Sequence, residues 1–134
     1  MKNPVMTILA SAGLLLAAAF PVAAHHSFSA EFDANKPVRL EGKVLRMEWT
    51  NPHTWLYIEV PGKDGKMEEW AVEGGAPGVL LRNGWKRDSL PPGTKIVVVG
   101  SQAKDGALRA NSRSIEFPDG RKLDTGSSQG KDGK

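Results

Sequence analysis

Three histidines are the residues of this sequence whose type and spacing point most directly to chemistry. His25 and His26 are adjacent, and His53 lies in the segment WTNPHTW at 49–55. Neutral imidazole is a common ligand of divalent transition metals, and Cu(II) stands at the top of their affinity order for nitrogen ligands. The histidines therefore predict a metal site, and Cu(II) is the cofactor that they favour.

The position of the first two histidines depends on a processing site. Residues 1–24 are typical of a secretory signal, with a positive charge at Lys2, an apolar run at 8–20 that is too short to span a bilayer, and small residues up to Ala24. We expect cleavage after Ala24, a periplasmic or secreted protein, and no membrane span in the processed chain. An uncleaved anchor is the alternative, although Pro21 interrupts the apolar run.

Cleavage after Ala24 makes His25 the amino terminus. Its α-amine and its imidazole ordinarily titrate near pH 8 and 6.5, so both can bind one metal ion at mild pH. His53 would then supply a third nitrogen. A second interpretation uses the amine, the following amide and the His26 imidazole, and it needs no folded site. In a third interpretation, His25 and His26 are solvated residues that follow a cleavage site, and His53 caps a turn.

Large aromatic residues form a second candidate site, for a small ligand or a protein partner: Trp49, Trp55 and Tyr57. Trp55 and Tyr57 alternate with three aliphatic residues, Leu56, Ile58 and Val60. If the aliphatic set faces the core, the two aromatic side chains form a surface patch. The other interpretation is that aromatic side chains fill the core, and this is the one favoured for Trp70 and Trp85.

Composition limits the class of protein. The processed chain, 25–134, has the length of one small domain, and the chain has no cysteine, so an apolar core must stabilise it without disulfides. The formal charge of +3 falls by one to +2 when Lys2 is removed with the signal. With no basic stripe in the sequence, we expect no nucleic-acid partner.

Alternating apolar and polar residues predict the strands. The alternation over 38–44 changes phase beside Gly42, which indicates a bulge or a sharp bend in the first strand. Four more strands are expected at 54–60, 68–73, 94–101 and 108–117. Residues 121–123 would add a short edge, and 25–37 would form an extended or partly ordered lead.

A short helix is expected at 76–85, with Leu81 and Trp85 facing the core together. Three strands, a helix and two further strands, with a bend in the first, are the order of the oligomer-binding (OB) barrel. We therefore expect a mainly β fold, a small five-stranded OB-like barrel over 25–125, with a disordered tail at 126–134. A small sandwich is the alternative.

Several segments resemble a known family. They are HHSF at 25–28, EWTNPH at 48–53, WAVEGG at 70–75, LLRNGW at 80–85 and GRKL at 120–123. They are similar to small exported proteins, mostly of proteobacteria, that are catalogued as a domain of unknown function. The resemblance covers nearly the whole processed chain. It implies an exported, barrel-like domain and implies no activity.

Catalytic motifs are absent from the sequence. There is no Gly-x-Ser-x-Gly, no phosphate loop and no histidine pair at metalloprotease spacing. Glu48 and Glu73 are the one candidate pair of carboxylates. The sequence thus favours a non-enzymatic binding domain. A cell-envelope structural or interaction module that uses the aromatic patch or a sheet edge is the alternative, and a copper-dependent oxidase ranks third.

Overall fold

The computed structural model describes residues 27–127, which form six strands and two short helices. Along the chain the elements are α1 (Ser27–Glu31), β1 (Phe32–Glu48), β2 (Trp55–Pro61), β3 (Met67–Glu73), α2 (Pro77–Arg82), β4 (Lys95–Ala103), β5 (Arg109–Glu116) and β6 (Lys122–Asp124). The mainly β class is confirmed. The structure has one strand more than the five predicted, because the short edge pairs with β5 as β6.

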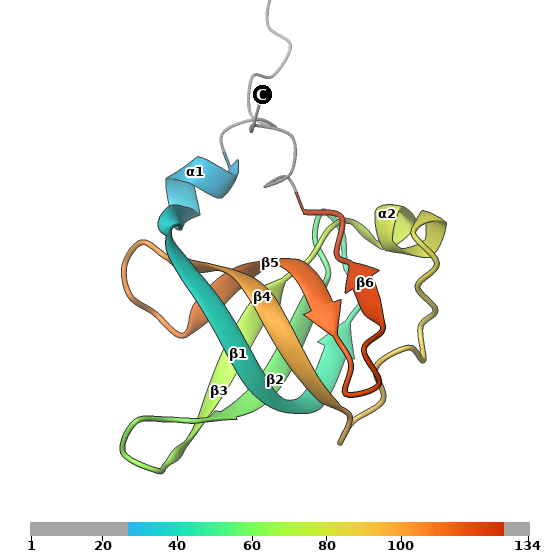
Figure 1. Cartoon of the computed structure of the whole chain (residues 1–134). Helices are drawn as coiled ribbons and strands as arrows, with labels where there is room; N and C mark the ends of the chain where they lie inside the picture. The colour runs from blue at the N-terminus through green and yellow to red at the C-terminus, as the bar shows by residue number, and fades with distance from the viewer. Residues whose placement is uncertain (1–26, 128–134) are drawn as a thin grey trace, which may run out of the picture.

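Five of the six strands form a closed ring, and β6 pairs with β5 alone. Their order is β3-β2-β1-β4-β5-β6, and an additional pairing joins β3 to β5. Figure 1 shows β1 crossing the front of the ring, with α1 and α2 at opposite sides of its upper rim. The β3–β5 pairing is parallel, whereas the other pairings are antiparallel. A single chain thus joins strands that are far apart in sequence around one core.

The predicted bend in the first strand is confirmed. The register between β1 and β2 shifts between Val44 and Arg46, which leaves an extra residue on β1. Gly42 lies just before this bulge, and a Cβ there would stand 2.5 Å from the carbonyl oxygen of Glu59 on β2. The first part of β1 therefore pairs with β4 and its last part with β2, with Lys43 in both registers. Because of the bend, β1 pairs with both β4 and β2.

The segment before this strand is more ordered than an extended lead. Ser27–Glu31 is helical, and β1 already begins at Phe32. The rings of Phe28 and Phe32 stack with their centroids 5.8 Å apart, and Phe32 is buried. The backbone N–H of Lys104 donates to the carbonyl of Glu31 at 2.9 Å. These contacts tie α1 to the loop that follows β4.

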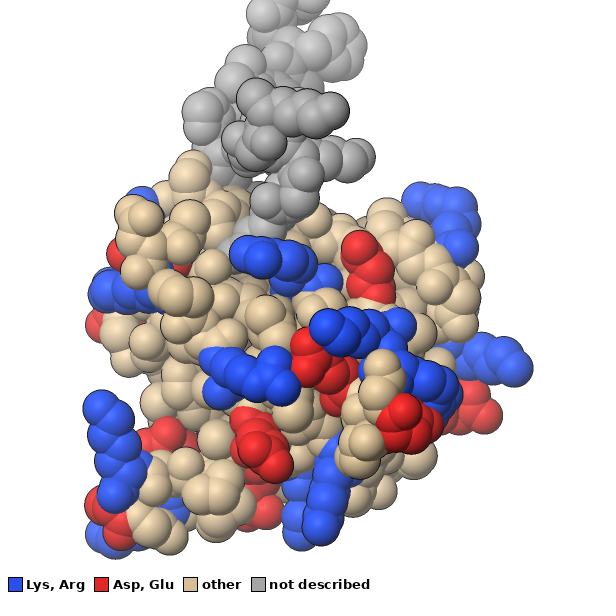
Figure 2. Space-filling model, viewed as in Figure 1, with Lys and Arg blue, Asp and Glu red and all other residues tan. Residues whose placement is uncertain are grey.

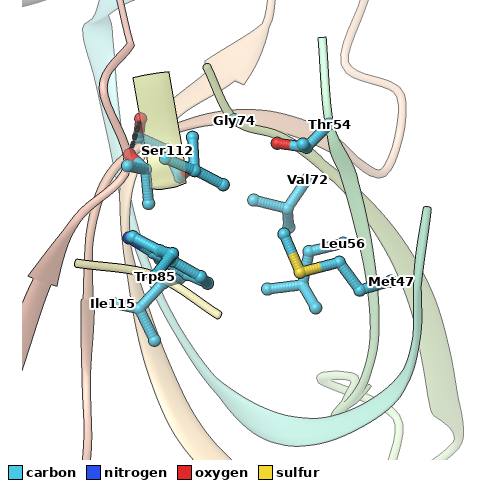
Figure 3. Close-up of a pocket in the computed structure, with 10 residues that line it drawn as sticks. Met47, Thr54, Leu56, Val72, Gly74, Trp85, Ser112 and Ile115 are labelled. Atoms are coloured by element: carbon cyan, nitrogen blue, oxygen red, sulfur yellow. Dashed lines mark hydrogen bonds between the residues drawn. The ribbon is translucent and has the colours of Figure 1, made fainter. Parts of the chain in front are cut away.

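The core fills the inside of the ring. The aliphatic face of β2 is buried there, together with apolar residues of the other strands. Trp70 and Trp85 are buried as predicted, and the Trp85 Nε1–H donates to the carbonyl of Asp124 at 2.8 Å. The interior retains a cavity of about 10 Å³, room for one water at most (Figure 3). The ring is therefore packed rather than hollow.

The prediction for the helix was wrong in one respect. Leu80, and not Leu81, faces the core, and Leu81 is 47% exposed. The helix ends at Arg82, and the chain then turns at Gly84, where φ is 90°. Because Trp85 lies beyond this turn, its spacing of four from Leu81 does not mark a shared helix face.

None of the helices between residues 27 and 127 is long and apolar enough to cross a membrane.

The carboxyl end of the described chain includes the start of the predicted tail. Gly126, the first residue of the predicted tail, is half-buried, and its N–H donates to the Asp124 carboxylate at 2.6 Å. Residues 128–134 lie outside the described part of the chain.

Candidate functional site

The two aromatic residues of β2 lie on the outer face of the ring. Because the aliphatic set of the same strand is buried, Trp55 and Tyr57 point the other way, and both are half-buried. The Arg46 guanidinium lies 3.6 Å from the centre of the Tyr57 ring. Arg46 is also within 3.0 Å of Glu69 and 3.6 Å of Glu48. Tyr57 is thus covered by an ion-pair network and is no bare patch.

Trp49 lies apart from this face. It is half-buried against the core, with the Arg87 guanidinium 5.4 Å from its ring centre. Its Nε1–H is buried and has no partner within residues 27–127. Trp49 therefore belongs mainly to the core.

One row of residues crosses the outer face from strand to strand. Glu48 is opposite Trp55, Trp55 is opposite Glu73, and Glu73 is opposite Asn111. Directly opposite residues of neighbouring strands project on the same side of a sheet. The row therefore places Trp55 between the two carboxylates that the sequence suggested as a pair.

Those two carboxylates have different surroundings. Glu48 keeps 46% of its side chain exposed and lies next to Arg46. Glu73 is only 7% exposed. Its Oε1 is 3.2 Å from the Nδ1 of His53 and accepts a hydrogen bond of 3.2 Å from the Nδ2 of Asn111. We therefore take Glu73, with His53 and Asn111, as the centre of the candidate site.

The contacts of His53 decide which of its nitrogens is available. Its Nδ1 faces the Glu73 carboxylate and also the carbonyl of Gly74, at 3.3 Å. Both neighbours are acceptors, so Nδ1 carries the proton. In the neutral ring Nε2 then carries the lone pair. About a third of the side chain is exposed, which leaves it accessible to a ligand.

Opposing effects act on the Glu73 carboxyl. Burial raises its pKa above the ordinary value, and the nearby His53 acts in the opposite direction. The charge of Glu31, at the end of α1, also raises this pKa, while the Asn111 hydrogen bond and Arg109 lower it. Arg109 is itself 3.7 Å from Glu31. The end of α1 therefore belongs to the same electrostatic neighbourhood as the His53–Glu73 pair.

Asn111 is the most deeply buried member of the cluster. It is 1% exposed, and its Oδ1 has no hydrogen-bond partner within the described residues. The next residue, Ser112, donates through Oγ to the carbonyl of Glu73 at 2.9 Å. The start of β5 thus holds both the side chain and the backbone of Glu73.

Two glycines allow the loop before β2 to reach Glu73. A Cβ at Gly74 would stand 2.6 Å from the Thr54 hydroxyl, and one at Gly75 would stand 2.8 Å from the carbonyl of Gly126. The Thr54 N–H donates to the carbonyl of Gly75, and the Gly74 N–H donates to the carbonyl of Thr54. This close contact brings His53 against the end of β3.

Two members of this cluster were predicted from the sequence as candidate site residues. His53 was a candidate ligand, and Glu73 was a candidate carboxylate, but their contact with each other was not predicted. Asn111 was missed, because nothing local marks an asparagine whose neighbours come from another strand. The glycine pair at 74–75 was the one usable signal, since it indicates a close backbone approach.

Two predicted ligands are not part of the structure. His25 and His26 lie outside the described residues, which begin at Ser27. Within 27–127 no group of three His, Cys, Asp or Glu side chains is arranged to hold a metal ion.

A larger concavity lies on the surface of the described part of the chain. A groove of about 760 Å³ lies between β1 and the β2–β3 hairpin, and Trp70 and Leu108 are among its lining residues. On the face seen in Figure 2, basic and acidic side chains are interspersed. The His53–Glu73 cluster is not among the lining residues of this groove.

Comparison with known proteins shows the family and no more. No curated protein and no solved structure matches this chain. A family model matches residues 12–112, which is most of the chain and includes His53, Glu73 and Asn111. The chain therefore belongs to a family of unknown function, DUF6152.

Proposed function

We propose that this protein is an exported, non-enzymatic binding domain that binds Cu(II) through its amino-terminal histidines and His53. The observation that carries this proposal is the contact of His53 Nδ1 with Glu73, which leaves Nε2 as the donor nitrogen. Carboxylates in this position are the usual outer partners of metal-bound histidines, where they orient the ring and raise its basicity.

The other ligands come from the start of the processed chain. The α-amine and imidazole of His25 form a chelate, and His53 completes a set of three nitrogens suited to Cu(II). The electrostatic influence of Glu31 on Glu73 supports this arrangement, because Glu31 ends the helix that begins two residues after His25. The alternative chelate at His26 uses no folded residue.

The finer fold and the location are part of the same proposal. The ring of β1, β2, β3, β5 and β4, with α2 between β3 and β4, supports an OB-like barrel. The signal-like composition of residues 1–24 supports export to the periplasm or medium. Nucleic acid is not among the proposed partners.

Copper titration of three proteins tests the metal site: the chain beginning at His25, the same chain with its α-amine acetylated, and the His53→Ala variant. We expect both changes to weaken Cu(II) binding by more than about 100-fold, beyond the 10–100-fold typical of losing an outer partner.

Two other results of this titration would contradict the proposed copper site. If acetylation weakens binding and His53→Ala does not, the peptide chelate at His26 replaces the folded site. If neither change matters, copper binding is not a function of these residues.

A second candidate function is an interaction module, and the free edge of β3 favours it. β3 pairs with β5 only over Ala71–Glu73, and Met67 at its other end is 51% exposed. The N–H of Ala71 donates to the carbonyl of Leu108 outside the β2–β3 ladder, so by alternation Glu69 also directs its backbone outward. This candidate predicts rapid hydrogen exchange at the Glu69 amide, with protection when solubilised envelope proteins are added. Unchanged exchange would contradict it.

A further inference from the structure

The groove of about 760 Å³ on the surface opens onto the core. Leu40, Val60 and Trp70 line it, and they are the three least buried members of the apolar core, with 8%, 9% and 7% of their surface exposed. In Figure 1 the β4–β5 loop and the β2–β3 hairpin extend from the same side of the ring, and both contribute lining residues. Ligand sites typically have volumes of about 300–1,000 Å³, so the groove has the size of one.

The groove exists because β1 and β2 diverge. Their ladder ends at the pair of Lys43 and Glu59. Two residues further along, the same register would bring Glu41 opposite Pro61, and a proline has no N–H to donate. From Pro37 to Gly42, β1 continues with β4 as its one partner among the described strands. The other side of β1 is therefore open along the groove.

The backbone groups on this open side follow from the alternation of the ladder. The N–H of Val44 donates to the carbonyl of Thr94, which lies on the side of β4. Backbone groups of successive residues in a strand point to opposite sides, so Leu40 also directs its N–H and carbonyl to β4. Arg39 and Glu41 then direct theirs into the groove. An added strand could form hydrogen bonds with both residues.

The charged side chains around the groove indicate what such a strand carries. Arg39, Lys63 and Asp64 are exposed, and the Arg39 guanidinium is in an ion pair of 2.9 Å with β5. Glu68 is half-buried, and no cation of the described residues lies within 4.0 Å of its carboxylate. Its Oε2 accepts a hydrogen bond of 3.3 Å from the Nε1 of Trp70. Because water solvates Glu68 less than the exposed groups, Glu68 would gain most from a cationic partner.

We infer that the groove binds an extended peptide segment, which pairs with β1 at Arg39 and Glu41 and places a lysine or arginine side chain against Glu68. Alternate side chains of a strand face the same way. The segment therefore carries its basic residue and an apolar residue two positions apart, with the apolar side chain over Trp70. About five residues, at about 3.3 Å each, span the open part of β1.

The test uses two pentapeptides with blocked ends, Thr-Val-Thr-Lys-Thr and Thr-Lys-Thr-Val-Thr, which cover both orders of the apolar and basic residues. Each is titrated into the chain without residues 1–24, and NMR measures amide hydrogen exchange. We expect one peptide to bind with a Kd of about 1 mM or lower. At about five times this Kd, the amides of Arg39 and Glu41 should exchange about sixfold more slowly. The Leu40 amide, already in the β4 ladder, should not change.

The charge contact is tested in the peptide and in the protein. Replacing the lysine of the peptide by glutamate should weaken binding by at least about tenfold. This preference for lysine should largely disappear in the Glu68→Gln variant. The matched control is Glu69→Gln, because the next residue of β3 projects from the opposite face, and there the preference should persist.

Three results would overturn the inference. The first is that neither peptide binds at about 5 mM. The second is slowed exchange at the Glu69 amide in place of Arg39 and Glu41, which would put the peptide on the edge of β3. The third is a preference for lysine that Glu68→Gln leaves unchanged.

Discussion

At the scale of single residues, His53 and Glu73 are the pair on which the proposed chemistry depends. Both were candidates from the sequence, for separate sites. Their contact gives Glu73 a positioning role: it directs the proton of His53 to Nδ1 and leaves Nε2 for a ligand.

This role predicts the effect of Glu73→Gln on copper affinity. A glutamine can donate as well as accept, so it no longer specifies the tautomer of His53. We expect the Cu(II) affinity to fall by about 10–100-fold. In ¹⁵N NMR of the metal-free protein, His53 should change from one tautomer to a mixture. Glu48→Gln should leave both measurements unchanged, and an unaltered tautomer in the Glu73 variant would remove the positioning role.

We expect the ion pairs of a second residue, Glu116, to cause part of the protein's loss of stability at acid pH. Hydrogen bonds from Arg39 and then from Lys122, at 2.9 and 3.0 Å, lower the pKa of Glu116 below its ordinary value of 4.5. A carboxyl with a lowered pKa in the folded state stabilises the protein above its ordinary pKa, and this contribution is lost as the pH falls through the folded value. Urea unfolding should therefore show that the Glu116→Gln variant loses less free energy of unfolding below about pH 4.5 than the unmutated protein does.

The comparison for this prediction is Glu41→Gln. Glu41 is exposed on β1 and makes no ion pair within the described part of the chain. If both variants show the same change in how stability depends on pH in the acid range, the ion pairs of Glu116 have no specific effect.

At the scale of elements, the Gly74–Gly75 pair joins three segments: the end of β3, the loop before β2 and the segment after β6. The N–H of Gly75 donates to the carbonyl of Thr125 at 2.7 Å, and the N–H of Gly74 donates to the carbonyl of Thr54 at 2.9 Å. The site therefore depends on a close approach of backbones, which any side chain at position 74 would disturb.

Gly74→Ala should lower the free energy of unfolding by about 1–3 kcal/mol, as overpacking of a tight contact does. The new Cβ would stand 2.6 Å from the Thr54 hydroxyl. Adding Thr54→Ala should recover part of the loss by removing that hydroxyl. Gly78→Ala is the matched control, because its Cβ meets only the end of the Arg82 side chain at 3.4 Å in a helix. Chemical denaturation gives all three values, and equal losses at positions 74 and 78 would contradict this account.

At the scale of the whole molecule, ring closure depends on contacts between distant parts of the chain. The parallel β3–β5 pairing brings Glu73 to Asn111. The segment after β5 completes the structure: Leu123 packs against the core, Thr125 is buried, and Trp85 donates to the carbonyl of Asp124.

Truncation after Gly120 should therefore cost at least about 2 kcal/mol of stability, the lower end for removing one large apolar side chain from a core. Truncation after Ser127 keeps all of these contacts and should leave the melting temperature unchanged. Similar melting curves for the two truncated chains would show that β6 does not stabilise the ring.

The sequence by itself determined the local features of this protein. Alternation predicted the strands, the phase change near Gly42 predicted the bulge, and the burial of Trp70 and Trp85 followed from their size in a chain without disulfides. The family followed from short motifs. These features are readable because each depends on neighbours within a few residues.

Only the tertiary structure decided which of these residues meet. Which face of β2 is buried, which of Leu80 and Leu81 points inward, and the burial of Glu73 depend on how the ring closes. The cluster of His53, Glu73 and Asn111 joins a loop and two strands through a parallel pairing between residues 38 positions apart. No local pattern encodes such a pairing, because its partners are chosen by the packing of the whole core.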